Sequence, residues 1–145
     1  MKQEDTDDEE SKDNEEKNAK MLDSLQAYIT PTAFHSPSGL KTLKPNILQQ
    51  LLENNTDIST VSISHTMRPL VPFIVQILAK FTNLTNVSLR NTNIGDQAIK
   101  YFSELPNLTE LDLKQCNLTN VGPLEDCPKL TQLDLRDNHL TNAFG

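Results

Sequence analysis

Residues 108–118, LTELDLKQCNL, carry the pattern that decides the fold. The same spacing of apolar residues returns at residues 130–140, LTQLDLRDNHL, and at residues 84–94, LTNVSLRNTNI. A weaker copy, ISTVSISHT, occupies residues 58–66 and lacks the last apolar position, because Arg68 stands there. The copies begin 22 to 26 residues apart, so the chain contains an internal repeat.

The copies share a composition as well as a spacing. They follow the pattern LxxLxLxxNxL, in which Cys116 takes the Asn/Cys place of the third copy and Thr92 that of the second. Residues 45–145, with repeats starting near residues 58, 84, 108 and 130, therefore resemble the leucine-rich repeat proteins. The resemblance implies an α/β fold, a right-handed solenoid with about four parallel strands on its concave side and helices on its convex side.

The segments that return from one predicted strand to the next differ along the chain. Residues 70–81 predict a convex helix whose apolar face includes Phe73. The next return predicts a helix opened by Asp96 as its N-cap, with inward-facing Ala98, Ile99, Phe102 and Leu105. Residues 119–129 contain a glycine and two prolines and predict a tight extended or 3₁₀ connection. The coils thus resemble the ribonuclease-inhibitor-like subclass, followed by a shorter coil of the 22-residue type.

The chain before the repeats divides into a tail and a flank. Residues 1–20 hold nine acids and four lysines but a single apolar residue after the first methionine, which predicts a disordered acidic tail. Apolar residues recur at helical spacing over residues 21–29, and prolines, a glycine and hydroxyl side chains follow. Residues 21–44 are therefore predicted to be a flexible linker with one short helix.

An amphipathic helix is predicted where the repeat domain begins. Pro45 suits the first position of a helix, and one apolar face is formed by Ile47, Leu48, Leu51 and Leu52. The end of a solenoid otherwise exposes its core and a strand edge. We therefore expect residues 45–56 to cover that end as an N-terminal cap.

Charge and cysteine content exclude several classes of protein. The net charge is −7, of which −5 lies in residues 1–20, so the remainder lacks the basic stripe of a nucleic-acid surface. The longest apolar run, residues 70–79, is too short to span a membrane. Two cysteines and no apolar leader favour an intracellular, cytoplasmic protein, with a nuclear or cytoskeletal location left open.

Catalytic patterns are missing from the sequence. His35, His65 and His139 are too scattered for a metal site or a Cys/His pair. Cys116 occupies a structural place in the repeat, where a buried thiol is the expectation. The chain also lacks phosphate-binding glycine motifs. We expect no enzymatic activity, no metal and no cofactor.

The residues between the inward leucines are predicted to face outward along the concave sheet, because side chains alternate along a strand. One predicted column holds serines and then aspartates, and its neighbour holds arginine and lysine. The predicted protein-binding residues are Asn86, Ser88, Arg90, Glu110, Asp112, Lys114, Gln132, Asp134 and Arg136.

Two interpretations of these charges remain open. An acidic line beside a basic line suits recognition of a protein surface with complementary charge. Alternatively, the opposite charges neutralise each other across strands and only keep the face soluble. The strip has no aromatic anchor of the kind that dominates interfaces. Asp112 and Asp134 are expected to stay ionised, because Lys114 and Arg136 lie beside them.

The resemblance implies a non-enzymatic module that binds a protein partner, as a subunit or fragment of a larger assembly. The alternatives are a regulatory subunit that restrains or recruits an enzyme, such as a GTPase or a ubiquitin-ligase substrate, and a purely structural spacer. Further repeats or another chain are expected to cover the C-terminal edge. Candidate phosphorylation sites, set by neighbouring acids or by a following proline, are Thr6, Ser11 and Ser36.

Overall fold

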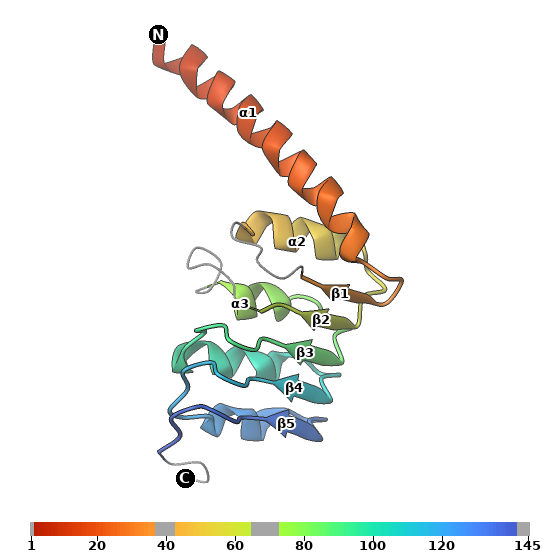
Figure 1. Ribbon diagram of the computed structural model, residues 1–145, viewed down its shortest axis with the longest axis vertical. Coiled ribbons are helices and arrows are strands. Elements are labelled where there is room, and N and C mark those ends of the chain that lie inside the picture. The colour runs from red at the N-terminus through yellow and green to blue at the C-terminus, as the bar shows by residue number, and fades with distance from the viewer. Residues whose placement is uncertain (1, 37–42, 65–72, 142–145) are drawn as a thin grey trace.

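A single parallel sheet organises the molecule (Figure 1). The computed structural model describes residues 2–36, 43–64 and 73–141, and for residues 2–11 and Asn14 it describes the backbone alone. The five strands lie side by side in chain order: β1 (Ala33–His35), β2 (Thr60–Ser62), β3 (Asn86–Ser88), β4 (Glu110–Asp112) and β5 (Gln132–Asp134). The predicted parallel sheet is therefore confirmed, with one strand more than the sequence predicts.

Strand register places equivalent residues of each repeat in one row. The middle residue of every strand points into the core, so Phe34, Val61, Val87, Leu111 and Leu133 form an inner column. The first four are at most 2% exposed, whereas Leu133 is 42% exposed because β5 is the edge strand of the described sheet. Leu113 is fully buried, and Leu135 of the last coil is partly buried.

Short helices on the convex side connect the strands. They are α2 (Pro45–Glu53), α3 (Ile74–Leu78), and the 3₁₀ helices η2 (Asp96–Glu104) and η3 (Gly122–Asp126). Helix α3 is shorter than predicted, and residues 70–72 of the predicted helix lie outside the described residues. Phe73, expected to face inward, precedes α3 and is 49% exposed. The tight 3₁₀ connection predicted for the third coil is confirmed by η3.

Helix η2 departs from the prediction at its start. Gly95, with φ 76°, precedes the helix, and Asp96 makes no capping bond to it. The Asp96 carboxylate instead accepts hydrogen bonds from the backbone of Thr119 (2.8 Å) and Asn120 (3.2 Å) and from the Thr119 hydroxyl. It ties one coil to the next. The prediction for the inward side is confirmed, since Ala98, Ile99, Phe102 and Leu105 are buried.

The N-terminal region is more ordered than the sequence predicts. Helix α1, Lys2–Leu25, covers the predicted disordered tail, and glutamate and lysine favour helix. The apolar residues Met21, Leu22 and Leu25 at its C-terminal end pack on the core, while the rest extends away from the solenoid (Figure 1). A 3₁₀ turn, η1 (Gln26–Tyr28), follows. None of the described helices has the length and apolar character needed to cross a bilayer.

Strand β1 lies in the segment predicted to be linker. Helix α2, predicted to precede the first strand as a cap, instead lies between β1 and β2 in the chain. Residues 37–42 of the predicted linker lie outside the described residues. Beyond β1, Ile29 forms an antiparallel bridge with Phe34, and Thr30 and Ala33 exchange backbone hydrogen bonds of 2.9 and 3.4 Å. The N-terminal edge of the sheet is thus occupied by the chain itself.

Candidate protein-binding surface on the concave sheet

The predicted binding residues lie together on the concave face, and we call these nine side chains the concave strip: Asn86, Ser88, Arg90, Glu110, Asp112, Lys114, Gln132, Asp134 and Arg136. Register places Asn86, Glu110 and Gln132 in one row and Ser88, Asp112 and Asp134 in the next. All nine side chains are at least partly exposed. The six residues in these two rows line an open hollow of about 440 Å³ together with residues of β1 and β2.

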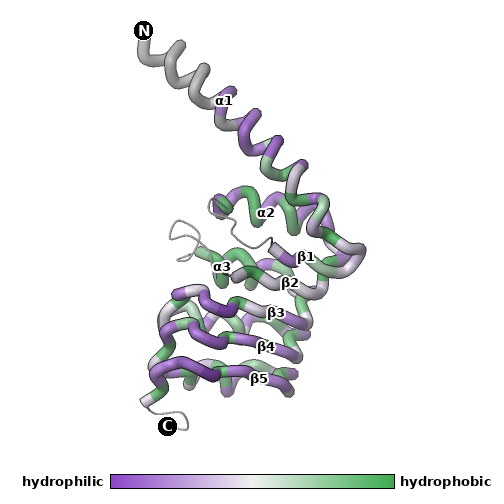
Figure 2. The backbone as a smooth tube through the Cα atoms, in the orientation of Figure 1, coloured by the Kyte–Doolittle hydropathy of each residue, from purple (hydrophilic) through white to green (hydrophobic). Residues whose placement is uncertain are grey.

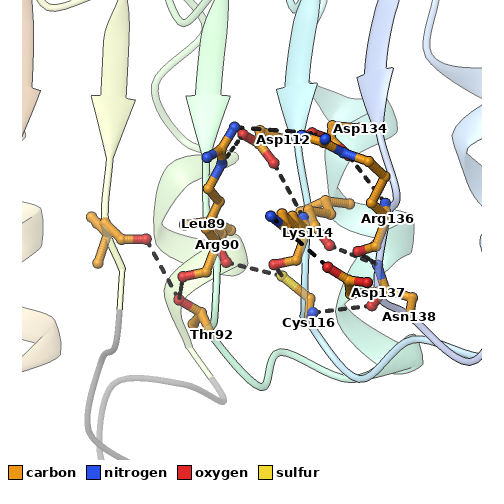
Figure 3. A network of polar contacts seen from close by, with 12 residues as sticks. Leu89, Arg90, Thr92, Asp112, Lys114, Cys116, Asp134, Arg136, Asp137 and Asn138 are labelled. Carbon is orange, nitrogen blue, oxygen red and sulfur yellow. Dashed lines mark hydrogen bonds and ion pairs between the residues drawn. The ribbon is translucent and has the colours of Figure 1, made fainter.

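The two arginines of the concave strip pair with its two aspartates, and Lys114 lies 3.9 Å from Asp137 outside the strip (Figure 3). Arg90 forms an ion pair with Asp112, and its terminal nitrogen lies 3.9 Å from Asp134. Arg136 donates to Asp134 through Nη2 at 2.7 Å and Nε at 3.0 Å. Hydrogen bonds from Arg136 lower the pKa of Asp134 to about 2, so this carboxylate is ionised as predicted. Most of the charge on the strip is therefore compensated locally.

Both aspartates also hold the backbone where their strands end. Asp112 accepts a hydrogen bond from the Lys114 amide, and Asp134 accepts one from the Arg136 amide, each at 3.1 Å. The next residues, Gln115 and Asp137, adopt left-handed φ angles of 56° and 62°. The local signal for this role is an aspartate two residues before a basic residue. The sequence prediction gives Asp112 and Asp134 a binding role only, so this structural role is an additional finding.

Glu110 differs from the other acids of the concave strip. Its carboxylate accepts a hydrogen bond of 2.7 Å from the Asn86 amide. The ion pairs found among the described residues join Arg90, Lys114 and Arg136 to aspartates and do not include Glu110. Glu110 is therefore the carboxylate of the strip that has spare capacity for a cation from a partner.

Sequence reasoning missed His35, which it placed in a linker. His35 ends β1, pairs in register with Ser62 and lines the same hollow as the concave strip. The sequence signal for this strand is Phe34 between the two outward-facing residues Ala33 and His35. Three residues are too few for such an alternation to identify a strand. The concave face thus has a half over β1 and β2, lined by His35, Thr60 and Ser62, and a charged half over β3–β5. Within the sheet, the tube in Figure 2 is most hydrophilic along β3–β5.

Beneath the strip, polar side chains of successive repeats connect the coils. Asn138 accepts backbone hydrogen bonds from Cys116 and Leu118, both at 3.0 Å, and donates to Leu113 (2.8 Å) and Leu135 (2.9 Å). The Cys116 thiol is buried and lies 2.9 Å from the carbonyl oxygen of Leu89. Burial raises the pKa of Cys116 to about 11, which disfavours the nucleophilic thiolate.

The remaining candidate positions lie apart from the strip. The side chains of Thr6 and Ser11 are outside the part of α1 that the structure describes. Ser36 follows β1, and its amide donates to the Ser62 carbonyl at 2.8 Å. No group of three or more metal-ligating side chains is found among the described side chains, which are those of residues 12, 13, 15–36, 43–64 and 73–141.

Comparison with known proteins agrees with the repeat. Residues 82–140, which contain β3, β4 and β5, match the family model described as leucine rich repeat. No curated protein matches the chain. Repeats of this kind generally form extended concave surfaces that bind other proteins.

Proposed function

Because this chain is a leucine-rich repeat protein, we propose that it binds a protein partner through the concave strip and catalyses no reaction. The single observation that supports this function is the register of β3, β4 and β5. It places polar side chains from three separate repeats on one face of a parallel sheet. Side chains held on strands are well positioned for recognition, since little conformational entropy remains to be lost on binding.

The ion pairs determine what kind of recognition the strip can offer. Exposed pairs such as Arg90–Asp112 contribute roughly 0–1 kcal/mol each. A partner can therefore exchange them for its own charges at small cost, and gains orientation and association rate more than affinity. The Glu110 carboxylate accepts a hydrogen bond from the Asn86 side-chain amide and forms no ion pair among the described residues, so it offers the first contact for a basic side chain.

The experiment is capture of partners from cells with the wild-type chain and with Glu110→Lys. Glu110 holds no backbone turn, so the substitution leaves the strand ends intact. The Asp112→Lys/Asp134→Lys variant tests the aspartate row, with circular dichroism as a check on folding. Its matched control is Glu104→Lys/Asp126→Lys, which makes the same charge change on two exposed residues of the convex helices.

We expect a specific partner to be lost with the strip variants and retained with the control. If the partner is retained by every variant, its contact lies on α1, on the convex helices or at the edge of β5, and the proposal fails. If the captured partner is an enzyme whose activity changes on binding, the chain acts as a regulatory subunit. Failure to capture any specific partner favours a structural spacer.

A further inference from the structure

Three side chains over β1–β3 have hydrogen-bonding groups that the described part of the chain does not use. Register places His35, Ser62 and Ser88 side by side in one row, and all three line the hollow of about 440 Å³. Their side chains form no hydrogen bond or ion pair with another described residue. The two hydroxyls and the imidazole can each donate a proton to an acceptor.

The charged half of the concave face contains the opposite kind of unused group. The two aspartates of the concave strip are paired with its arginines, whereas Glu110 forms no ion pair among the described residues. A partner that covers the hollow removes water from both sets of groups. It must supply acceptors over β1–β3 and a cation over β4, because a polar group that loses water without a replacement weakens binding.

We propose that the partner contributes an extended segment with a basic and an acidic side chain four residues apart. This inference rests on the proposed function and specifies the chemistry of the partner. The basic side chain pairs with Glu110, and the carboxylate accepts hydrogen bonds from His35 and Ser62. Hydrogen bonds to a carboxylate are stronger than those to a neutral acceptor. The residues of β1 and β2 that line the hollow include no acid that would repel it.

The spacing of the two contacts follows from the geometry of the sheet. Glu110 is the first residue of β4, whereas His35 and Ser62 are the last residues of β1 and β2. The midpoint between His35 and Ser62 therefore lies two and a half strand spacings from Glu110 across the sheet and two residues further along the strands. With about 4.8 Å between strands and about 3.3 Å per residue, the separation is about 14 Å.

An extended segment covers this distance with both charged side chains on the same side. Four residues of extended chain span about 13–14 Å, and side chains four residues apart point the same way. In a helix the same distance takes about nine residues, or about two and a half turns, which places the two side chains on opposite sides. The extended conformation is therefore the one that presents both charges to the sheet.

NMR titration of the full chain with synthetic peptides tests the spacing. The probe is acetyl-Arg-Ser-Ala-Ser-Glu-amide. The control, acetyl-Arg-Ser-Ala-Glu-Ser-amide, has the same composition but places its carboxylate on the other side of the extended chain. Each peptide is also tested with its sequence reversed, because the sheet does not fix the direction of the segment. We expect the probe to shift the amide resonances of Glu110 and Ser62, with a dissociation constant about fivefold lower than that of the control.

Substitution of Ser62 tests the sign of the charge that the partner places over β2. Ser62→Lys is expected to lower the dissociation constant of the probe by about twofold to fivefold, and Ser62→Asp to raise it by a similar factor. The matched control is Ser103, a partly exposed serine of η2 on the convex side, where Ser103→Lys and Ser103→Asp should have no effect. The NMR spectrum of each variant checks that it is folded.

Three results would overturn the inference: equal binding of probe and control peptides, binding of neither, or tighter binding of the probe by Ser62→Asp. The proposed function fails separately, when Glu110→Lys still captures the partner from cells. If Glu110→Lys loses the partner while the two peptides bind alike, the proposed function stands and the inference about the extended segment is wrong.

Discussion

The two ends of the sheet hold equivalent residues in opposite environments. Phe34 in β1 and Leu133 in β5 belong to the same inner column, yet Phe34 is fully buried and Leu133 is 42% exposed. At the N-terminal end, Leu25 and Ile29 cover the coil, whereas no described segment covers β5. Burial in a solenoid is thus conferred by the neighbouring coil, and a leucine in the repeat pattern does not guarantee it.

The largest effect is expected from Phe34→Ala at the covered end. The side chain is fully buried, so its removal leaves a cavity and costs about 3–5 kcal/mol of unfolding free energy. Urea denaturation followed by circular dichroism measures it. A loss below about 1 kcal/mol would mean that Phe34 is not enclosed, and that the two ends are alike.

Leu111→Ala and Leu133→Ala compare an inner strand with the open edge. Leu111 is 2% exposed, and its truncation is expected to cost about 2–5 kcal/mol. Leu133→Ala should cost distinctly less, because nearly half of the side chain is already in water. Both are measured by urea denaturation followed by circular dichroism. Equal losses would contradict the asymmetry.

Asn138→Ala probes how the last coil is held to the coil before it. The substitution removes an amide that bonds to Cys116, Leu118, Leu113 and Leu135. Leaving these groups unpaired is expected to cost about 1–3 kcal/mol. The exposed Asn93→Ala is the matched control and should change the unfolding free energy by less than about 0.5 kcal/mol.

The smallest effect is expected at Asp134, and it depends on pH. Its pKa is lowered to about 2 in the folded protein, so its stabilising contribution is present above its ordinary pKa near 3.8 and fades as the pH falls to 2. Wild type should therefore be slightly more stable than Asp134→Asn at pH 6. At pH 2 the difference should shrink.

A carboxyl titration followed by NMR gives the midpoint for Asp134 directly. A midpoint near 3.8 would show that Arg136 does not hold the carboxylate. Ser62→Ala is the control, because Ser62 lies in the half of the concave face without this network. The difference in unfolding free energy between wild type and Ser62→Ala should be the same at pH 6 and at pH 2.

The sequence predicted the features that recur in every repeat. Leucines of three aligned copies define the inner column, so the outward rows of β3, β4 and β5 followed by alternation, and register confirms them. Strand β1 was missed because three residues between prolines carry no periodicity. Helix α1 was missed because composition argued for disorder, although its residues favour helix.

Other errors came from tertiary contacts that local patterns do not contain. Asp96 has the residue type and position of an N-cap, but the amides of Thr119 and Asn120 in the next coil compete for its carboxylate. Phe73 has the spacing of the apolar helical face predicted for residues 70–81. Helix α3 begins at Ile74, so Phe73 lies before the helix and is 49% exposed. Sequence alone also did not reveal that Asp112 and Asp134 hold the turns after their strands.

Amide hydrogen exchange tests most directly the claim that the coils stack and that one end is open. In the structure, Ser36, Ile63, Leu89 and Leu113 each donate a hydrogen bond of 2.8–2.9 Å to the next strand, and Leu135 is the equivalent residue at the edge. We predict strong protection of these four amides and fast exchange of the Leu135 amide, for which no described strand supplies an acceptor. Protection of Leu135 equal to that of Leu113 in dilute solution, or fast exchange at Leu113, would contradict it.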